Sequence, residues 1–112
     1  MERMRYLQTE EVILVMTDNK NRLICDRVLS KGTVNCSLMS PREVFLVALE
    51  YHAVHILLIH NHPSGDAAPS RQDIEITEHL ARLCDMMQLP LLDHIIVGDG
   101  CYVSFKESGL LK

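Results

Sequence analysis

Several features that mark whole classes of protein are missing from this 112-residue chain. It has no block of like charge. Eleven Lys and Arg stand against fifteen Asp and Glu, which gives a formal net charge of −4. Without a basic face, nonspecific binding to nucleic acid or to an anionic membrane is disfavoured. No apolar run reaches the roughly 18 to 20 residues of a membrane span, and residues 1–11 contain no apolar signal-peptide core. The sequence therefore predicts a soluble, cytoplasmic protein with no membrane association.

Paired cysteines, repeats, linkers and low-complexity stretches are missing too. None of the four cysteines forms a C-x-x-C pair, so neither a cysteine-based zinc site nor a thioredoxin-like motif is indicated. We expect reduced thiols. With 47% apolar and 23% charged residues the composition is ordinary for a globular protein, and residues 1–112 are expected to form one domain. The cysteines are Cys25, Cys36, Cys84 and Cys101.

Apolar runs bounded by turn signals predict a set of strands. The polar turns 18–21 and 98–100 each separate two such runs, as in β-hairpins. The run 56–59 is apolar at every position, which is typical of a central strand covered by helices on both faces. The predicted strands span 12–16, 23–29, 56–59, 91–97 and 101–105, with a weaker extended stretch around 34–38.

Two segments carry helix-start signals. Ser40 precedes a proline and stands three residues before Glu43, which predicts a capped helix. Ser70 stands three residues before Asp73 in the same way, and apolar residues then recur at three- and four-residue spacing. The order β-β-(β)-α-β-α-β-β predicts an α/β layered domain with a mixed β-sheet and flanking helices. The helices are expected over about 41–51 and 71–89.

The segment from His60 to Asp73 carries the candidate chemistry. His60 and His62 are two residues apart at the end of a predicted strand, so both imidazoles point to one side and can reach one cation. Asp73 lies in the first turn of the next helix. Two imidazoles and one carboxylate leave a tetrahedral zinc a fourth position for water, which is typical of a catalytic zinc site. The pKa of such a water would fall to about 7, which gives a nucleophile at neutral pH.

Each of these residues also has an ordinary structural interpretation. A histidine at a strand end is more often structural than a ligand, and Ser70 with Asp73 is also what a capping box requires. The chain has no H-E-x-x-H, P-C-x-x-C or G-x-S-x-G pattern, which argues against other zinc and serine hydrolases. The unusual feature is the joint arrangement: H-x-H, seven residues, Ser, two residues and Asp, across a strand exit and a helix entry.

This arrangement resembles the JAMM (JAB/MPN) metalloprotease motif, H-x-H-x7-S-x2-D. The wider stretches 40–44, 60–70 and 92–98 resemble the bacterial RadC family, and the likeness extends from about Glu10 to Leu111. It implies a cytidine-deaminase-like, JAB-MPN layered fold. Longer RadC proteins carry a helix-hairpin-helix domain before this one, which we expect this chain to lack, so DNA binding by this domain is not expected.

The resemblance implies roles for individual residues. His60, His62 and Asp73 match the zinc ligands of the motif. Ser70 matches the serine whose hydroxyl helps to hold the water and to stabilise the oxyanion. No cofactor other than the one zinc ion is implied.

The JAMM pattern also includes a glutamate at the start of an early strand, which acts as the general base. Both Glu10 and Glu11 precede the strand predicted over 12–16. The family's register favours Glu10, whose parity matches Val12 and Leu14. Glu11 remains the alternative, and two solvated glutamates at a strand entrance would look the same in the sequence.

The other histidines are less informative. Asp93 and His94 belong to the RadC-like stretch, and for them we expect a strand-pairing or hydrogen-bonding role. The remaining three are expected at the surface or in packing positions: His52, His55 and His79.

We therefore expect a zinc metallohydrolase of the RadC/JAMM type that cleaves peptide or isopeptide bonds of a peptide or protein substrate. A non-catalytic interaction module is one alternative, although a complete ligand set argues against it. A DNA-repair accessory protein is another alternative, but the net negative charge of the chain argues against it. Iron, nickel or manganese could occupy the site in place of zinc. Strands rich in Ile and Val near the termini could pair with a second copy to form a homodimer.

Overall fold

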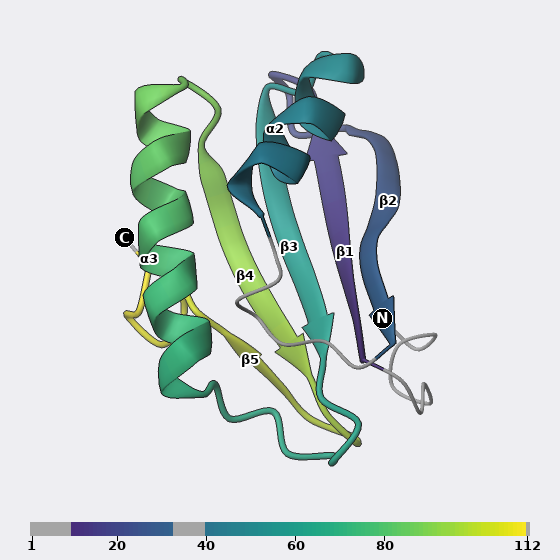
Figure 1. Cartoon of the computed structure of the whole chain (residues 1–112), viewed down its shortest axis with the longest axis vertical. Coiled ribbons are helices and arrows are strands. Elements are labelled where there is room, and N and C mark those ends of the chain that lie inside the picture. The colour runs from purple at the N-terminus through teal and green to yellow at the C-terminus, as the bar shows by residue number, and fades with distance from the viewer. Residues whose placement is uncertain (1–9, 33–39, 112) are drawn as a thin grey trace.

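A mixed β-sheet forms the centre of the computed structural model, which describes residues 10–32 and 40–111 (Figure 1). Five strands in this part of the chain lie in the order β2-β1-β3-β4-β5. β3 pairs antiparallel with β1 and parallel with β4, so the predicted α/β fold with a mixed sheet is confirmed. The strands are β1 (Glu10–Thr17), β2 (Leu23–Gly32), β3 (His55–Asn61), β4 (Leu91–Val97) and β5 (Tyr102–Ser104).

The strand predictions agree with the structure in position and pairing. β1 and β2 form the expected hairpin, and the Asp18 carboxylate accepts the N–H groups of Lys20 and Arg22 at 2.8 and 3.0 Å within its turn. The apolar run 56–59 lies in β3, the central strand. The extended stretch expected around 34–38 lies outside the described residues.

Both described helices, α2 (Pro41–Glu50) and α3 (Arg71–Met86), pack on one face of the sheet. The buried residues of the helices form one cluster with the even-numbered residues of β1 and β3, including Leu14 and Leu58. The opposite face carries a smaller cluster around Ile13 and Val97, which contains no residue of either helix. The prediction that helices cover both faces is therefore not met by the described part of the chain. Neither described helix is long and apolar enough to cross a membrane.

The two helix starts differ. α3 begins with the predicted capping box, since Ser70 Oγ accepts the Asp73 N–H at 3.0 Å and Asp73 Oδ2 accepts the Ser70 N–H at 2.9 Å. α2 begins at Pro41 as predicted, but the Ser40 side chain makes no capping hydrogen bond. The predicted helix start with Ser40 at the N-cap is therefore confirmed, although the Ser40 side chain does not cap the helix. The fixed φ of proline suits the first helical position, so this helix starts without the bond.

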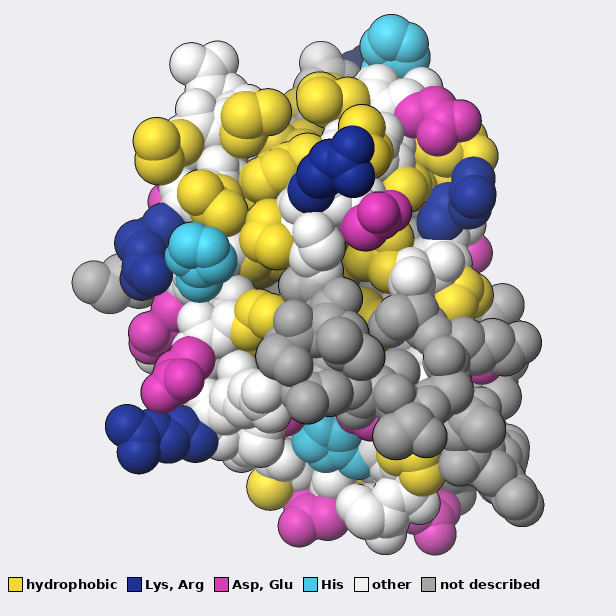
Figure 2. All heavy atoms as spheres, viewed as in Figure 1, with side chains coloured by type: hydrophobic (Ala, Val, Ile, Leu, Met, Phe, Trp, Pro, Cys, Tyr) yellow, Lys and Arg dark blue, Asp and Glu magenta, His cyan; other side chains and the backbone are white. Residues whose placement is uncertain are grey.

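The helical face also exposes apolar surface. Figure 2 shows hydrophobic side chains gathered over α2 and the C-terminal end of α3. Exposed side chains on these elements include Leu46, Leu49, Met86 and Met87. Polar buried residues, in contrast, gather where α3 begins and β3 ends.

Three cysteines in the described residues carry free thiols. Cys84 of α3 is buried in the core, and this burial raises the pKa of its thiol to about 11. Cys25 is half-buried and Cys101 is exposed. Cys36 lies outside the described residues.

Replacing Leu58 with Ala tests the core. Leu58 is fully buried in the central strand, so losing its methyl groups and leaving a cavity should lower the free energy of unfolding by about 2–5 kcal/mol. Leu46→Ala is the control, because that side chain is 52% exposed and should change stability by less than about 0.5 kcal/mol. Urea denaturation measures both. Equal losses in the two variants would contradict the assignment of β3 to the core.

Candidate metal centre

The end of β3 meets the beginning of β1 at a cluster of three possible metal ligands. His60 of β3 pairs with Val12 of β1, and Glu10 lies on the same face as Val12, two residues earlier. The Glu10 carboxylate contacts His60 Nε2 directly. Glu10, His60 and His62 each offer a ligand atom, and these atoms all lie within 4.8 Å of one another. This cluster could bind a metal ion.

A fourth side chain, Asp73 of α3, reaches the same place from the helix side. Its Oδ2 atom lies 3.3 Å from His62 Nε2, and its Oδ1 atom lies 3.9 Å from His60 Nδ1. Its carboxylate is also part of the capping box with Ser70, which fixes its direction relative to the helix. The structure thus brings together four candidate residues from the sequence: His60, His62, Asp73 and Glu10.

The hydrogen bonds of His62 determine which of its nitrogens faces the cluster. Nδ1 lies 3.0 Å from the Asp66 carbonyl oxygen, which can only accept, so Nδ1 carries a proton. Nε2 then points toward Asp73. The hydrogen bond to this carboxylate raises the pKa of His62, against the opposing effect of burial.

The donor set fits a divalent metal ion. His60 is almost fully buried, and its Nδ1 atom has no hydrogen-bond partner in the described part of the chain. A buried imidazole nitrogen without a hydrogen-bond partner lowers the stability of the fold, and a metal ion would supply that partner. Two imidazoles with carboxylates from two elements are ligands typical of zinc, although related divalent metals accept the same set.

A close backbone approach fixes the loop that follows His62. The His62 N–H donates to the Val97 carbonyl at 2.9 Å, and the Gly65 carbonyl accepts the Asp99 N–H at 2.9 Å. A Cβ atom placed on Gly98 would lie 2.3 Å from the Gly65 oxygen. Only glycine leaves room for this contact between the loop and the β4–β5 turn.

Behind the cluster lies a buried pair that the sequence did not reveal. Thr77 Oγ1 of α3 donates to the Asp73 carbonyl at 2.7 Å and lies 2.7 Å from His94 Nδ1 of β4. The His94 ring stacks on the His60 ring with centroids 5.9 Å apart. Burial lowers the pKa of His94 to about 3, so this imidazole is neutral. The only sequence signal for Thr77 is its place one helical turn after Asp73.

The structure also separates the two candidate glutamates. Glu10 reaches the cluster, whereas Glu11 is the next residue of an extended strand and so points to the opposite face. The backbone N–H of Glu11 donates to the Asn61 side-chain oxygen, which joins β1 to the end of β3. Ser70 is exposed, and its hydroxyl oxygen serves the helix cap.

The other singled-out residues lie outside the cluster. His52 and His79 are exposed and His55 is half-buried, in agreement with surface or packing positions. Asp93 accepts hydrogen bonds from the Ser104 hydroxyl and the Lys106 N–H, so it joins β4 to the segment after β5.

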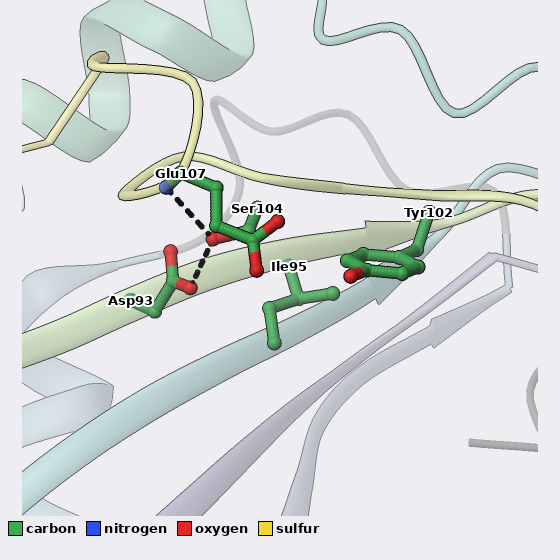
Figure 3. Close-up of a pocket in the computed structure, with 5 residues that line it drawn as sticks. All are labelled: Asp93, Ile95, Tyr102, Ser104 and Glu107. Carbon is green, nitrogen blue, oxygen red and sulfur yellow. Dashed lines mark hydrogen bonds between the residues drawn. The ribbon is translucent and has the colours of Figure 1, made fainter.

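A surface pocket of about 430 Å³ lies on the other face of β4 (Figure 3). Asp93 and Ile95, which line it, alternate along β4 with His94, so they point away from the cluster. The Asp93 carboxylate in this pocket already accepts the Ser104 hydroxyl. The pocket is thus separate from the candidate metal centre. Its lining residues are Asp93, Ile95, Tyr102, Ser104 and Glu107.

Replacing Gly98 with Ala tests the loop contact. The new methyl group would collide with the Gly65 carbonyl, so the loop and His62 must shift, and we expect metal affinity to fall about 10-fold or more. Gly109→Ala is the control, because a Cβ there meets nothing within 4 Å and only its positive φ is strained. Isothermal titration with Zn²⁺ measures both affinities. Unchanged affinity in Gly98→Ala would show that the contact does not position His62.

Comparison with known proteins shows what this chain is similar to. Residues 1–110 match the RadC-like JAB domain family. The UPF0758 protein TTE0897 of Caldanaerobacter subterraneus subsp. tengcongensis is 47% identical over 109 residues, which cover 97% of this chain and 47% of that protein. A UPF0758 protein of Methanosarcina mazei is 44% identical over 110 residues, which cover 98% of this chain and 48% of that protein. The chain spans about half the length of the curated relatives it matches.

Proposed function

This chain belongs to the RadC-like JAB domain family, and on that premise we propose that it is a zinc-dependent hydrolase of peptide or isopeptide bonds. The observation that carries the proposal is the meeting of two imidazoles and two carboxylates from β1, β3 with its following loop, and α3. Residues close in the sequence, such as His60 and His62, can lie side by side because of local structure alone. Glu10 and His60, however, are fifty residues apart and meet only through the pairing of β1 with β3.

Burial divides the four side chains into two roles. The side chains of His60 and Asp73 are 1% and 2% exposed, whereas those of Glu10 and His62 are 19% and 17% exposed. We assign His60, His62 and Asp73 to holding the metal. Glu10 stands at the open side, where a group that exchanges protons with substrate must lie.

The chain's own residues would then share the hydrolytic steps. Zinc, when bound, supplies a water of lowered pKa and polarises the substrate carbonyl. Glu10 accepts a proton from the attacking water and delivers it to the leaving amine. The Ser70 hydroxyl oxygen accepts the Asp73 N–H, which leaves its own O–H group able to donate to the developing oxyanion.

Elemental analysis of the purified protein tests the metal. We expect about one zinc per chain in the wild type and its loss in His62→Ala, because an imidazole ligand is removed. His79→Ala is the matched control, since this exposed histidine of α3 lies outside the cluster and should leave the zinc content unchanged. Protein that is folded but stays free of metal after incubation with zinc would contradict the proposal and favour an interaction module.

Replacing Glu10 with Gln tests the base. Gln keeps the shape but cannot take up the proton, so hydrolysis should fall about 10²- to 10⁴-fold while zinc stays bound. Turnover is measured on peptide and isopeptide substrates that the wild type cleaves, with zinc content determined in parallel. Glu11→Gln is the matched control, because its side chain points to the other face.

The outcomes for Glu10→Gln separate two roles. Loss of zinc together with activity would make Glu10 a metal ligand, as its place in the three-residue cluster also allows. Full activity with zinc bound would show that Glu10 is not the base.

A further inference from the structure

Thr77 and His94 form a fully buried hydrogen-bonded pair directly behind the candidate metal centre. Thr77 lies in α3, one turn after Asp73, and His94 lies in β4. The Thr77 hydroxyl oxygen is 2.7 Å from the Asp73 carbonyl oxygen and 2.7 Å from His94 Nδ1. The pair therefore joins the first turns of α3 to the sheet at the level of the cluster.

The direction of these hydrogen bonds follows from counting protons. The Asp73 carbonyl can only accept, so it takes the single hydroxyl proton of Thr77. His94 Nδ1 must then donate to the Thr77 oxygen. The chain of donation runs from His94 through Thr77 to Asp73. His94 Nε2 is left as an acceptor, and it has no hydrogen-bond partner among the described residues.

His94 also contacts the other side of the cluster. Its ring stacks on the rings of both His60 and Phe105, at centroid distances of 5.9 and 4.6 Å, and lies at 23° to each. The stacking restrains the plane of the His60 ring. A single buried imidazole thus touches His60 directly and Asp73 through Thr77.

Packing alone does not account for this pair. A helical threonine commonly donates to the carbonyl four residues earlier, but that bond requires no histidine. An apolar side chain at position 94 would fill a buried site without removing two ring nitrogens from water. The position of the Asp73 carboxylate also depends on the first turn of α3, because the capping box fixes the side chain to that turn.

We propose that Thr77 and His94 are positioning residues, which hold the Asp73 carboxylate and the His60 ring at the separation that metal binding requires. Neither residue binds the metal or touches substrate. The proposal rests on the metal site assigned under the proposed function. It predicts that removing the Thr77 hydroxyl weakens metal binding without removing a ligand.

A Co²⁺ titration of the metal-free protein tests this prediction, since the visible absorption of Co²⁺ reports the geometry of its ligands. We expect Thr77→Val to bind Co²⁺ about 10- to 100-fold more weakly than the wild type, with an altered spectrum. Thr77→Ser keeps the hydroxyl and should restore affinity to within about 3-fold. Thr17→Val is the matched control, because Thr17 is a half-buried residue at the opposite end of β1 from Glu10, with a weak 3.4 Å bond to the His55 carbonyl. Urea denaturation confirms that each variant is folded during the titration.

Histidine ¹⁵N NMR of the metal-free protein gives a second measurement that does not depend on metal. It should show His94 protonated on Nδ1 in the wild type and in Thr77→Ser, with that proton signal shifted or lost in Thr77→Val. A proton on Nε2 in the wild type would overturn the donation chain and the positioning role with it.

The outcomes separate this proposal from the proposed function. Wild-type protein that binds Co²⁺ while Thr77→Val binds it equally tightly, with the same spectrum, overturns the positioning role and leaves the metal site intact. Wild-type protein that binds neither Co²⁺ nor Zn²⁺ overturns the proposed function, and the positioning role falls with it. Weak binding in both Thr77→Val and Thr77→Ser would also overturn the proposal, because the hydroxyl would then not be the cause.

Discussion

The antiparallel register of β1 against β3 is the constraint on which the site depends. It places Val12 opposite His60, and therefore Glu10 on the same face as both. Because side chains alternate along a strand, a slip of one residue would turn Glu10 away and present Glu11 instead. The same register buries Leu14 and its even-numbered neighbours under the helices, so the hydrophobic core holds the register that the polar cluster needs.

The face under the helices is divided along its length. Around Met16 of β1 and Ile56 of β3 this face is apolar. At the opposite end it buries four polar side chains: His60, Asp73, Thr77 and His94. Polar groups buried so close together stabilise a fold only when each finds a partner. Most of them do, through the capping box and the Thr77 hydroxyl. Two buried nitrogens, His60 Nδ1 and His94 Nε2, find no partner among the described residues, and they lie beside and behind the cluster that could hold a metal.

Local signals explain what could be predicted from the sequence. His60, His62 and Asp73 lie within fourteen residues that include a strand end and a helix cap, so spacing and periodicity were enough to group them. The prediction of Glu10 depended on the resemblance to a family. The alternation of side chains along a strand shows which face Glu10 takes, but not which strand lies beside it. The motif predicted both helix starts, but only the Ser70 side chain caps its helix, since a serine before a proline does not need its side chain to start a helix. The pairing of Thr77 with His94 could not be foreseen, because it depends on how α3 crosses β4. The apolar run of β3 predicted its central place correctly but not which faces the helices cover.

The uneven exposure of the four clustered side chains has a kinetic consequence. The side chains of His60 and Asp73 are almost fully buried, so in the part of the chain that the structure describes a metal ion held by this cluster would be reached past the more exposed Glu10 and His62. Loading and release of such an ion would then involve movement of these two side chains rather than of the packed core. Exchange with a chelator would accordingly proceed in the folded state, and the loop that anchors His62 through Gly65 and Gly98 would influence its rate.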